Sequence, residues 1–230
     1  MGTAGSSPQV IAPPGLHEIA LNLVRRYVAP GRLVADLCAG QGAFSLRLVE
    51  AGYQVVPVDV DIQWFKVPTL SVVQADLNKS FADILGHRRF DCVVCLEGIE
   101  HLENPWDFLR QCRTLLRAGG ILLLSSPNVE CLLSRLIFLF RGSFLTFDRT
   151  MECPNHISPI LSWLLNYNLK QSGFVTREVT FTPPGWAANH SWKIWILSYA
   201  SRIVFPLVGD RWKGETRVIV AQAQDCSPEG

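Results

Sequence analysis

Hydrophobic and polar positions follow two regular patterns along the first half of the chain. Short apolar runs, several of them rich in β-branched residues, predict strands at Leu33–Cys38, Gln54–Val60, Leu70–Ala75, Phe90–Leu96 and Gly120–Ser125. Helical patterns between or before these runs predict helices at His17–Val28, Ala43–Ala51 and Asn104–Arg117. The runs are almost continuously apolar, as in strands that helices cover on both faces. The alternation therefore predicts an α/β fold with a doubly wound, Rossmann-like, mostly parallel sheet.

The second half of the chain has a different rhythm. Helices are predicted at Cys131–Phe140 and Pro159–Ser172, and strands at Phe174–Thr182 and Thr216–Gln224. We interpret residues 129–173, which contain both of these helices, and residues 183–214 as helical lid insertions on the acceptor side. The whole chain, residues 1–230, is then one domain. Residues 1–15 are small and polar, and we expect them to be a flexible N-terminus without a secretory signal.

Composition narrows the classes of partner and compartment. The 230 residues carry 21 Lys+Arg and 20 Asp+Glu, a net charge of +1, so nucleic acid is not an expected partner. Seven scattered cysteines indicate a reducing compartment, and we expect a cytoplasmic protein. The chain has no uncharged apolar stretch long enough to span a bilayer.

The motif richest in chemistry is a glycine-rich turn between the first strand and the next helix, Asp36-Leu37-Cys38-Ala39-Gly40-Gln41-Gly42. Glycines let a ligand approach the backbone, and the helix that follows offers free N–H groups. Ser45 stands where a dinucleotide fingerprint has its third glycine, and the lysine of a P-loop is absent. Asp36 would repel a pyrophosphate but suits a ligand that carries an ammonium group, such as an amino acid.

Two further acids follow the next two predicted strands. Asp59 lies at the end of the second strand, where a carboxylate can accept both hydroxyls of a ribose. Asp61 is an alternative for that role, although we expect it to face solvent. Asp76 ends the third strand and can accept a hydrogen bond from an adenine amino group. An amino acid, a ribose and an adenine together describe S-adenosylmethionine.

With these motifs in order, the sequence resembles the class I S-adenosylmethionine-dependent methyltransferases, including their small-molecule and quinone-type members. The resemblance rests on the turn at 36–42, on Asp59 and Asp76, and on the stretches 90–102 and 115–128. It implies a seven-stranded sheet with an antiparallel last strand, S-adenosylmethionine as cofactor and S-adenosylhomocysteine as product. The cofactor contacts that it implies are Asp36, Ala39, Gly40, Gln41, Gly42, Asp59, Val60, Asp76, Leu77, Leu96 and Glu97. Ala39 is a mild departure, since glycine or cysteine is common near its position.

Candidates for acid–base chemistry follow the fourth strand. Methyl transfer from a sulfonium is a direct displacement in which alignment supplies much of the acceleration, and an oxygen or nitrogen acceptor can also need a base. His101 is the first candidate for that base and His156 the second. We expect no metal site, because Cys92 and Cys95 are three residues apart in a strand and point to opposite faces.

The function that the sequence predicts is methyl transfer to a small molecule, most readily at oxygen, with a lipophilic acceptor as one option. The alternatives are a protein or RNA methyltransferase, and a module that binds S-adenosylmethionine without catalysis. Two apolar segments, 131–147 and 186–212, bear on the acceptor. They are either helices packed on the sheet, or a lid or peripheral membrane surface that serves a lipophilic acceptor.

Overall fold

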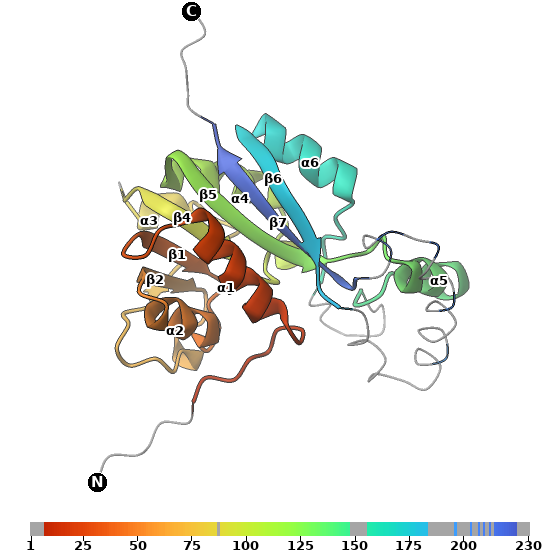
Figure 1. Cartoon of the computed structure of the whole chain (residues 1–230), viewed down its shortest axis with the longest axis horizontal. Helices are drawn as coiled ribbons and strands as arrows, with labels where there is room; N and C mark the ends of the chain where they lie inside the picture. The colour runs from red at the N-terminus through yellow and green to blue at the C-terminus, as the bar shows by residue number, and fades with distance from the viewer. Residues whose placement is uncertain are drawn as a thin grey trace, which may run out of the picture.

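The strands meet in one sheet at the centre of the molecule. The computed structural model describes residues 7–86, 88–147, 156–183 and 214–224, with five single residues between 196 and 212. Within these residues, seven strands pair in the order β3-β2-β1-β4-β5-β7-β6 (Figure 1). Their bounds are β1 Leu33–Leu37, β2 Gln54–Asp59, β3 Val73–Gln74, β4 Phe90–Cys95, β5 Leu116–Pro127, β6 Phe174–Phe181 and β7 Thr216–Ala223. β7 is antiparallel to both of its neighbours, and the other pairs are parallel. The predicted Rossmann-like sheet is confirmed.

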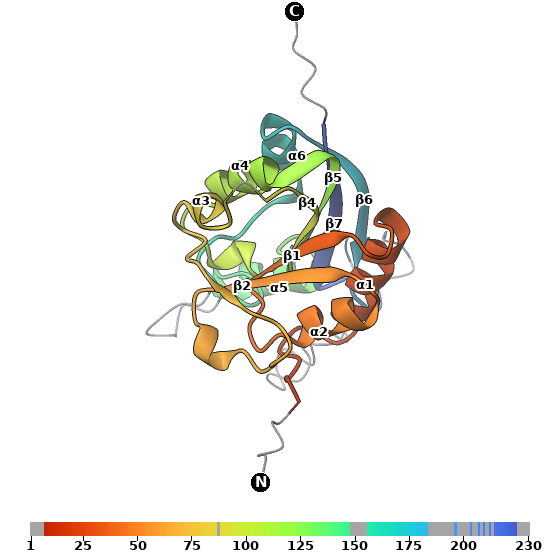
Figure 2. The ribbon, with the colours of Figure 1, turned by 90° about the vertical axis from the view of Figure 1, so that its left-hand side faces the viewer.

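Helices cover both faces of the sheet. α1 (Leu16–Tyr27) and α2 (Ala43–Glu50) pack on one face. α3 (Phe81–Ile84), α4 (Pro105–Leu115) and α6 (Ser162–Gln171) pack on the other (Figure 2). α5 (Leu132–Arg141) lies beyond the carboxyl end of β5, to one side of the sheet in Figure 1. Two single-turn 3₁₀ helices, η1 (Ile62–Trp64) and η2 (Ile99–His101), follow β2 and β4.

Two hydrophobic cores lie on the two sides of the central strands. In β4, Cys92 and Val94 belong to the core under α1 and α2, whereas Val93 and Cys95 belong to the core under α4 and α6. Successive side chains of a strand point to opposite faces, so a nearly continuous apolar run is buried on both sides. The prediction that Cys92 and Cys95 face opposite ways is confirmed.

Three predicted boundaries were wrong. The run Leu70–Ala75 forms only the two-residue edge strand β3, so Asp76 lies just beyond the strand instead of ending it. The helix predicted to reach Arg117 stops at Leu115, because Leu116 already pairs with Phe90 of β4. The strand predicted to start at Gly120 starts at Leu116, and Gly119 and Gly120 lie inside β5 where its register with β4 shifts.

The order of the strands places the site. β1 pairs with β2 on one side and with β4 on the other. The strands up to β3 therefore extend the sheet on one side of β1, and the strands from β4 onward extend it on the other side. Ligands of open α/β sheets bind at such a switch point, at the carboxyl ends of the strands. Most of the predicted insertion 183–214 falls outside the described residues.

Candidate functional site

The turn between β1 and α2 has a backbone that glycine makes feasible. Gly40 and Gly42 have φ of 55° and 85°, in the left-handed region. A Cβ on Gly42 would lie 2.7 Å from side-chain atoms of both Phe65 and Val67, so no other residue fits without a shift. Gly40 has open space where its Cβ would be, and this leaves the backbone accessible to a ligand.

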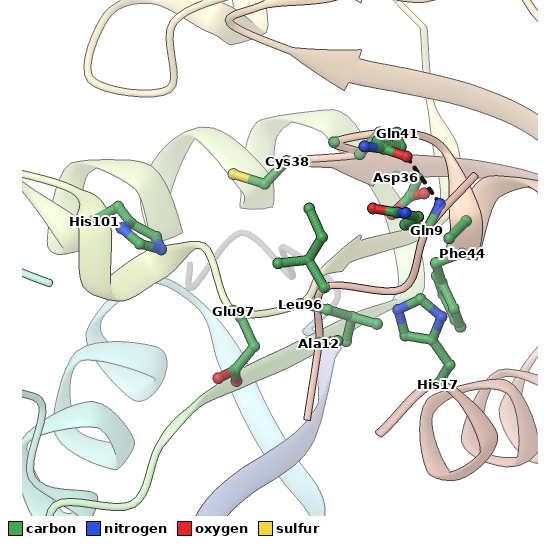
Figure 3. A pocket seen from close by; sticks show the side chains of 14 residues that line it. Gln9, Ala12, His17, Asp36, Cys38, Gln41, Phe44, Leu96, Glu97 and His101 are labelled. Carbon is green, nitrogen blue, oxygen red and sulfur yellow. Dashed lines mark hydrogen bonds between the residues drawn. The ribbon is translucent and has the colours of Figure 1, made fainter. Parts of the chain in front are cut away.

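A cavity of about 210 Å³ opens at the carboxyl ends of β1 and β4 (Figure 3). Seven of the residues predicted for cofactor or catalysis line it: Asp36, Ala39, Gly40, Gln41, Leu96, Glu97 and His101. Figure 3 shows His101 and Glu97 at one end of the cavity and Asp36, Gln41 and His17 at the other. The candidate base His101 therefore lies at the opposite end of the cavity from the glycine turn.

Asp36 is a buried acid at the floor of the cavity. Its Oδ2 accepts a hydrogen bond of 2.5 Å from the Ser45 hydroxyl. Burial raises the pKa of Asp36 to about 7, and the hydrogen bond from Ser45 opposes this rise. A positively charged group bound next to Asp36 would favour the ionised carboxylate.

Asp59 fixes the turn from the neighbouring strand. Its Oδ2 accepts from the backbone N–H of Gly40 at 2.7 Å, and its Oδ1 accepts from the N–H of Asp61 at 3.0 Å. Asp61 itself is exposed and accepts from the N–H of Gln63, as expected for a residue facing solvent. Val60 is 60% exposed beside them. Asp59 is thus the acid of this strand end that contacts the glycine turn.

The third acid lies farther along the same edge. The Asp76 carboxylate accepts from the N–H of Asn78 and lies 3.4 Å from the Lys79 ammonium. Leu77 has its side chain in the core under α4. Neither residue lines the cavity, so a contact with a cofactor would be made beside it.

The sequence did not reveal the N-terminal wall of the cavity. Gln9, Ile11, Ala12 and His17 line it, and the N–H of Gln9 donates to Gln41 Oε1 at 2.9 Å (Figure 3). Within the described residues, the buried Nδ1 of His17 has no hydrogen-bond partner. Burial lowers the pKa of His17 to about 4, so the imidazole is neutral at pH 7. The one available signal was a histidine at the start of an amphipathic helix.

At the other end of the cavity, Glu97 has a strained backbone, with φ of 51°. Its N–H donates to Ser125 Oγ, and that hydroxyl donates to Glu97 Oε1, both at 2.8 Å. Burial raises the pKa of Glu97 to about 7. Two hydrogen bonds to one serine therefore fix the direction of this carboxyl group.

The two candidate histidines lie together. The ring centroids of His101 and His156 are 4.7 Å apart in an edge-to-face arrangement. Burial and the neighbouring His101 lower the pKa of His156 to about 4. The ligand atoms of Glu100, His101 and His156 all lie within 4.8 Å of one another. Among the described residues, this is the group with the spacing to hold a metal ion.

Comparison with known proteins identifies the family. A family model described as a methyltransferase domain matches residues 17–177, which include nearly all of α1, the glycine turn, strands β1 to β5 and the first half of β6. The chain belongs to this methyltransferase family. The family resemblance proposed from the sequence is confirmed, and S-adenosylmethionine is the cofactor of the family.

Solved structures show the same fold. A methyltransferase from Archaeoglobus fulgidus, described as S-adenosylmethionine dependent, is 20% identical, with a TM-score of 0.62 over 90% of this chain and 94% of that one. Magnesium protoporphyrin IX methyltransferase from Synechocystis, with bound S-adenosylhomocysteine, is 18% identical, with a TM-score of 0.59 over 91% and 84%.

Curated relatives are more similar in sequence. The ubiquinone biosynthesis O-methyltransferase of Xanthomonas campestris is 36% identical over 121 residues, which are 49% of this chain and 51% of that protein. That of Stutzerimonas stutzeri is 29% identical over 124 residues, 49% and 53% of the two chains. This chain matches about half the length of these relatives.

The residues of the cavity suit S-adenosylmethionine. The cofactor carries an ammonium, a sulfonium, a carboxylate and a ribose diol. Asp36 and Glu97 line the cavity and Asp59 holds its glycine turn, so carboxyl groups whose charge suits the cations and the diol lie in and beside the cavity. The unpartnered buried Nδ1 of His17 is one polar atom that a bound cofactor can satisfy. The glycine turn leaves the backbone open between them.

Proposed function

We propose that this chain transfers the methyl group of S-adenosylmethionine to a hydroxyl oxygen of a small lipophilic molecule. The observation that carries the proposal is the position of His101. It lies at the end of the cavity opposite Asp36, and His156 packs against its ring. The O-methyltransferases among the relatives support the choice of oxygen.

The chain's own groups hold the cofactor in this proposal. Asp59 accepts the ribose hydroxyls while it keeps the N–H of Gly40 in place, and Asp36 faces the methionine ammonium at the floor of the cavity. When bound, the cofactor supplies a methyl group on a sulfonium, an electrophile with an excellent leaving group. The protein contributes alignment, because an in-line approach of the acceptor oxygen supplies much of the rate.

Proton removal falls to the histidine pair. His101 lines the cavity and takes the proton of the acceptor hydroxyl as the oxygen attacks, whereas His156 does not line the cavity and contacts the ring of His101. Because the pKa of His156 is about 4, its ring stays neutral near pH 7 and does not place a second positive charge beside His101. His156 therefore positions the base.

A panel of matched acceptors tests the proposal. The purified chain is incubated with S-adenosylmethionine labelled in its methyl group and with a long-chain catechol, the corresponding aniline and the corresponding thiophenol. We expect the label on the catechol oxygen at the highest kcat/KM. Label on protein or RNA substrates alone would contradict the small-molecule proposal. Cofactor binding without transfer to any acceptor would favour a module without catalysis.

A lipophilic acceptor fits the surface around α5. This helix exposes Phe138, Leu139 and Phe140 in sequence, the last two at 73% and 70%. It contains no acidic residue, and Arg135 and Arg141 are its charges. The chain after α5 returns to the candidate site, where the ring centroid of Phe147 lies 5.4 Å from that of His156. Exposed apolar side chains beside arginines are typical of a helix at a lipid interface.

We propose that α5 rests on an anionic membrane surface from which the acceptor enters. No helix among the described residues has the length and hydropathy to cross a bilayer, so the contact is interfacial in this proposal. It also gives a reason for the apolar segment 131–147, of which only Leu133, Ile137, Leu145 and the N-cap Cys131 form a small buried cluster. Phe138, Leu139 and Phe140 of this segment are exposed.

Vesicle flotation tests the membrane contact. We expect the protein to float with vesicles of phosphatidylcholine and phosphatidylglycerol in equal parts, and less with phosphatidylcholine alone. Replacing Leu139 and Phe140 by Glu should weaken partitioning at least ~10-fold, because each buried side chain contributes roughly 1.5–3 kcal/mol. The matched control is Ile84→Glu on α3, an exposed apolar residue remote from α5 (Figure 1). Equal flotation of all variants, or none by the native protein, would exclude the contact.

A further inference from the structure

Cys38 has a backbone conformation that side chains rarely adopt. It is the first residue after β1, and its φ is 59°. It lines the cofactor cavity at the start of the glycine turn. In Figure 3 its thiol points toward the end where His101 lies and away from Gln41. A non-glycine residue held in this region indicates that the side chain has a use there.

The partner of Cys38 is Cys95, the last residue of β4. Leu37 and Cys95 are register partners in the parallel pair of β1 and β4, so Cys38 lies just beyond. The Cys38 side chain lies close enough to Cys95 to raise the pKa of the Cys95 thiol. Gly98 shows how closely they lie, since its ideal Cβ position is 2.6 Å from the Cys95 sulfur and 2.7 Å from the Cys38 sulfur. A glycine at position 98 makes room for both sulfurs.

The two thiols differ in access. Cys38 is partly exposed to the cavity, whereas Cys95 is fully buried. The adjacent Cys38 side chain, together with burial, raises the pKa of the Cys95 thiol well above its usual value. The other cysteines of the described residues, Cys92, Cys112 and Cys131, are buried. Within the described part of the chain, a small reagent that enters the cavity therefore meets Cys38 first.

We propose that Cys38 and Cys95 are an oxidisable thiol pair that a hydroperoxide converts into a disulfide at the wall of the cofactor cavity. The Cys38 sulfur attacks a peroxide oxygen, an S–O bond forms and the O–O bond breaks. The departing oxygen takes the proton that the Cys38 thiol loses and leaves as an alcohol or as water. The Cys95 sulfur then attacks the Cys38 sulfur, so that an S–S bond forms and the S–O bond breaks. The oxygen leaves with the Cys95 proton as water. Two electrons pass from the thiols to the hydroperoxide.

The disulfide acts on cofactor binding, and this part rests on the function proposed above. An S–S bond of about 2.05 Å is shorter than any non-bonded contact of two sulfurs, so it draws Cys38 toward β4. Ala39 and Gly40 follow Cys38 directly, and the N–H of Gly40 is the group that Asp59 holds. Displacing this turn removes the groups that bind the cofactor from their positions.

Peptide mapping and calorimetry test the pair on the full chain. The reduced protein is treated with stoichiometric hydrogen peroxide, alkylated after denaturation and mapped by mass spectrometry. S-adenosylhomocysteine is titrated into both forms.

We expect oxidation to form a Cys38–Cys95 crosslink. It should also weaken the binding of S-adenosylhomocysteine at least ~10-fold, equivalent to about 1.4 kcal/mol. Dithiothreitol should restore the full affinity. Cys95→Ala should abolish the crosslink and the loss of affinity. Cys92→Ala, on the same strand but in the opposite core, should retain both.

Three outcomes separate the parts of the proposal. Peroxide treatment without a Cys38–Cys95 crosslink overturns the thiol pair. A crosslink that leaves the affinity for S-adenosylhomocysteine unchanged overturns the effect on the cofactor site. If the reduced protein binds no S-adenosylhomocysteine although the crosslink forms, the proposed function fails and the thiol pair stands.

Discussion

Replacing Asp59 by Ala should weaken the binding of S-adenosylhomocysteine by roughly 100-fold. In the proposed site, Asp59 accepts the two ribose hydroxyls, and hydrogen bonds to a charged group contribute about 1.5–3 kcal/mol each. The substitution also removes the acceptor that holds the N–H of Gly40 at 2.7 Å, so the glycine turn loses its support from β2. Isothermal titration calorimetry measures the change, and thermal unfolding shows whether the variant is folded.

Asp61 supplies the matched control for this prediction. Asp59→Asn and Asp61→Asn remove one charge each from the same strand end and keep an oxygen that can accept from the backbone. Asp61 is exposed and accepts from the N–H of Gln63, away from the turn, so its replacement should leave the affinity nearly unchanged. If Asp61→Asn weakens binding and Asp59→Asn does not, the ribose ligand is Asp61.

Local pattern was sufficient for most of the fold. β1, β2 and β4 are short apolar runs bounded by turns, and a strand buried on both faces has that composition wherever it occurs. β3 was overestimated because an edge strand pairs on one side only, and just Val73 and Gln74 have partners on β2. The start of β5 was placed too late, since the pairing of Leu116 with Phe90 depends on a neighbour far away in the chain.

The site was predictable where it depends on strand ends. Parallel strands bring their carboxyl ends to one edge, so Asp36, the glycine turn and Glu97 were expected together and line one cavity. The wall formed by Gln9 and His17 was not predicted, because the hydrogen bond from Gln9 to Gln41 joins segments that no local pattern connects. Likewise, no local pattern predicts that the thiols of Cys38 and Cys95, at the ends of adjacent strands, lie next to each other.

His101 and His156 show most clearly what tertiary structure adds. The sequence offered them as alternatives for one role, because each is a histidine in a loop with no visible relation to the other. The structure brings them into contact and gives them different surroundings. His101 lines the cavity, whereas His156 packs between His101 and Phe147. We therefore propose one base, His101, and one positioning residue, His156, in place of two alternative candidates.

Replacing His101 by Gln should lower kcat by on the order of 10²- to 10⁴-fold, the usual range for loss of a general base. Gln has hydrogen-bonding groups but cannot take the proton of the acceptor hydroxyl, so the loss should fall mainly on kcat, with less effect on the KM for cofactor. His156→Gln should reduce kcat by roughly 10-fold, because His156 acts through the orientation of His101. Steady-state kinetics on the best acceptor measures both variants.

The pH profile of kcat and the effect of a chelator distinguish His101 as the general base from a pair of titrating histidines and from a metal site. The pKa of His156 is about 4, so its ring binds no proton as the pH falls from 7 to 5. If one base is protonated in that interval, log kcat should fall with a slope of one, whereas protonation of both imidazoles would give a slope of two. Full activity of His101→Gln at every pH would exclude His101 as the base. Asp36 and Glu97 line the same cavity and have pKa values of about 7, so the unit slope must also disappear in His101→Gln.

A chelator tests the metal site. Because Glu100, His101 and His156 have the spacing of a metal site, loss of activity with a chelator would indicate that these three residues bind a metal ion. A slope that His101→Gln removes, with activity that a chelator leaves unchanged, would place the proton on His101, whereas a slope that persists would assign it to a carboxyl group.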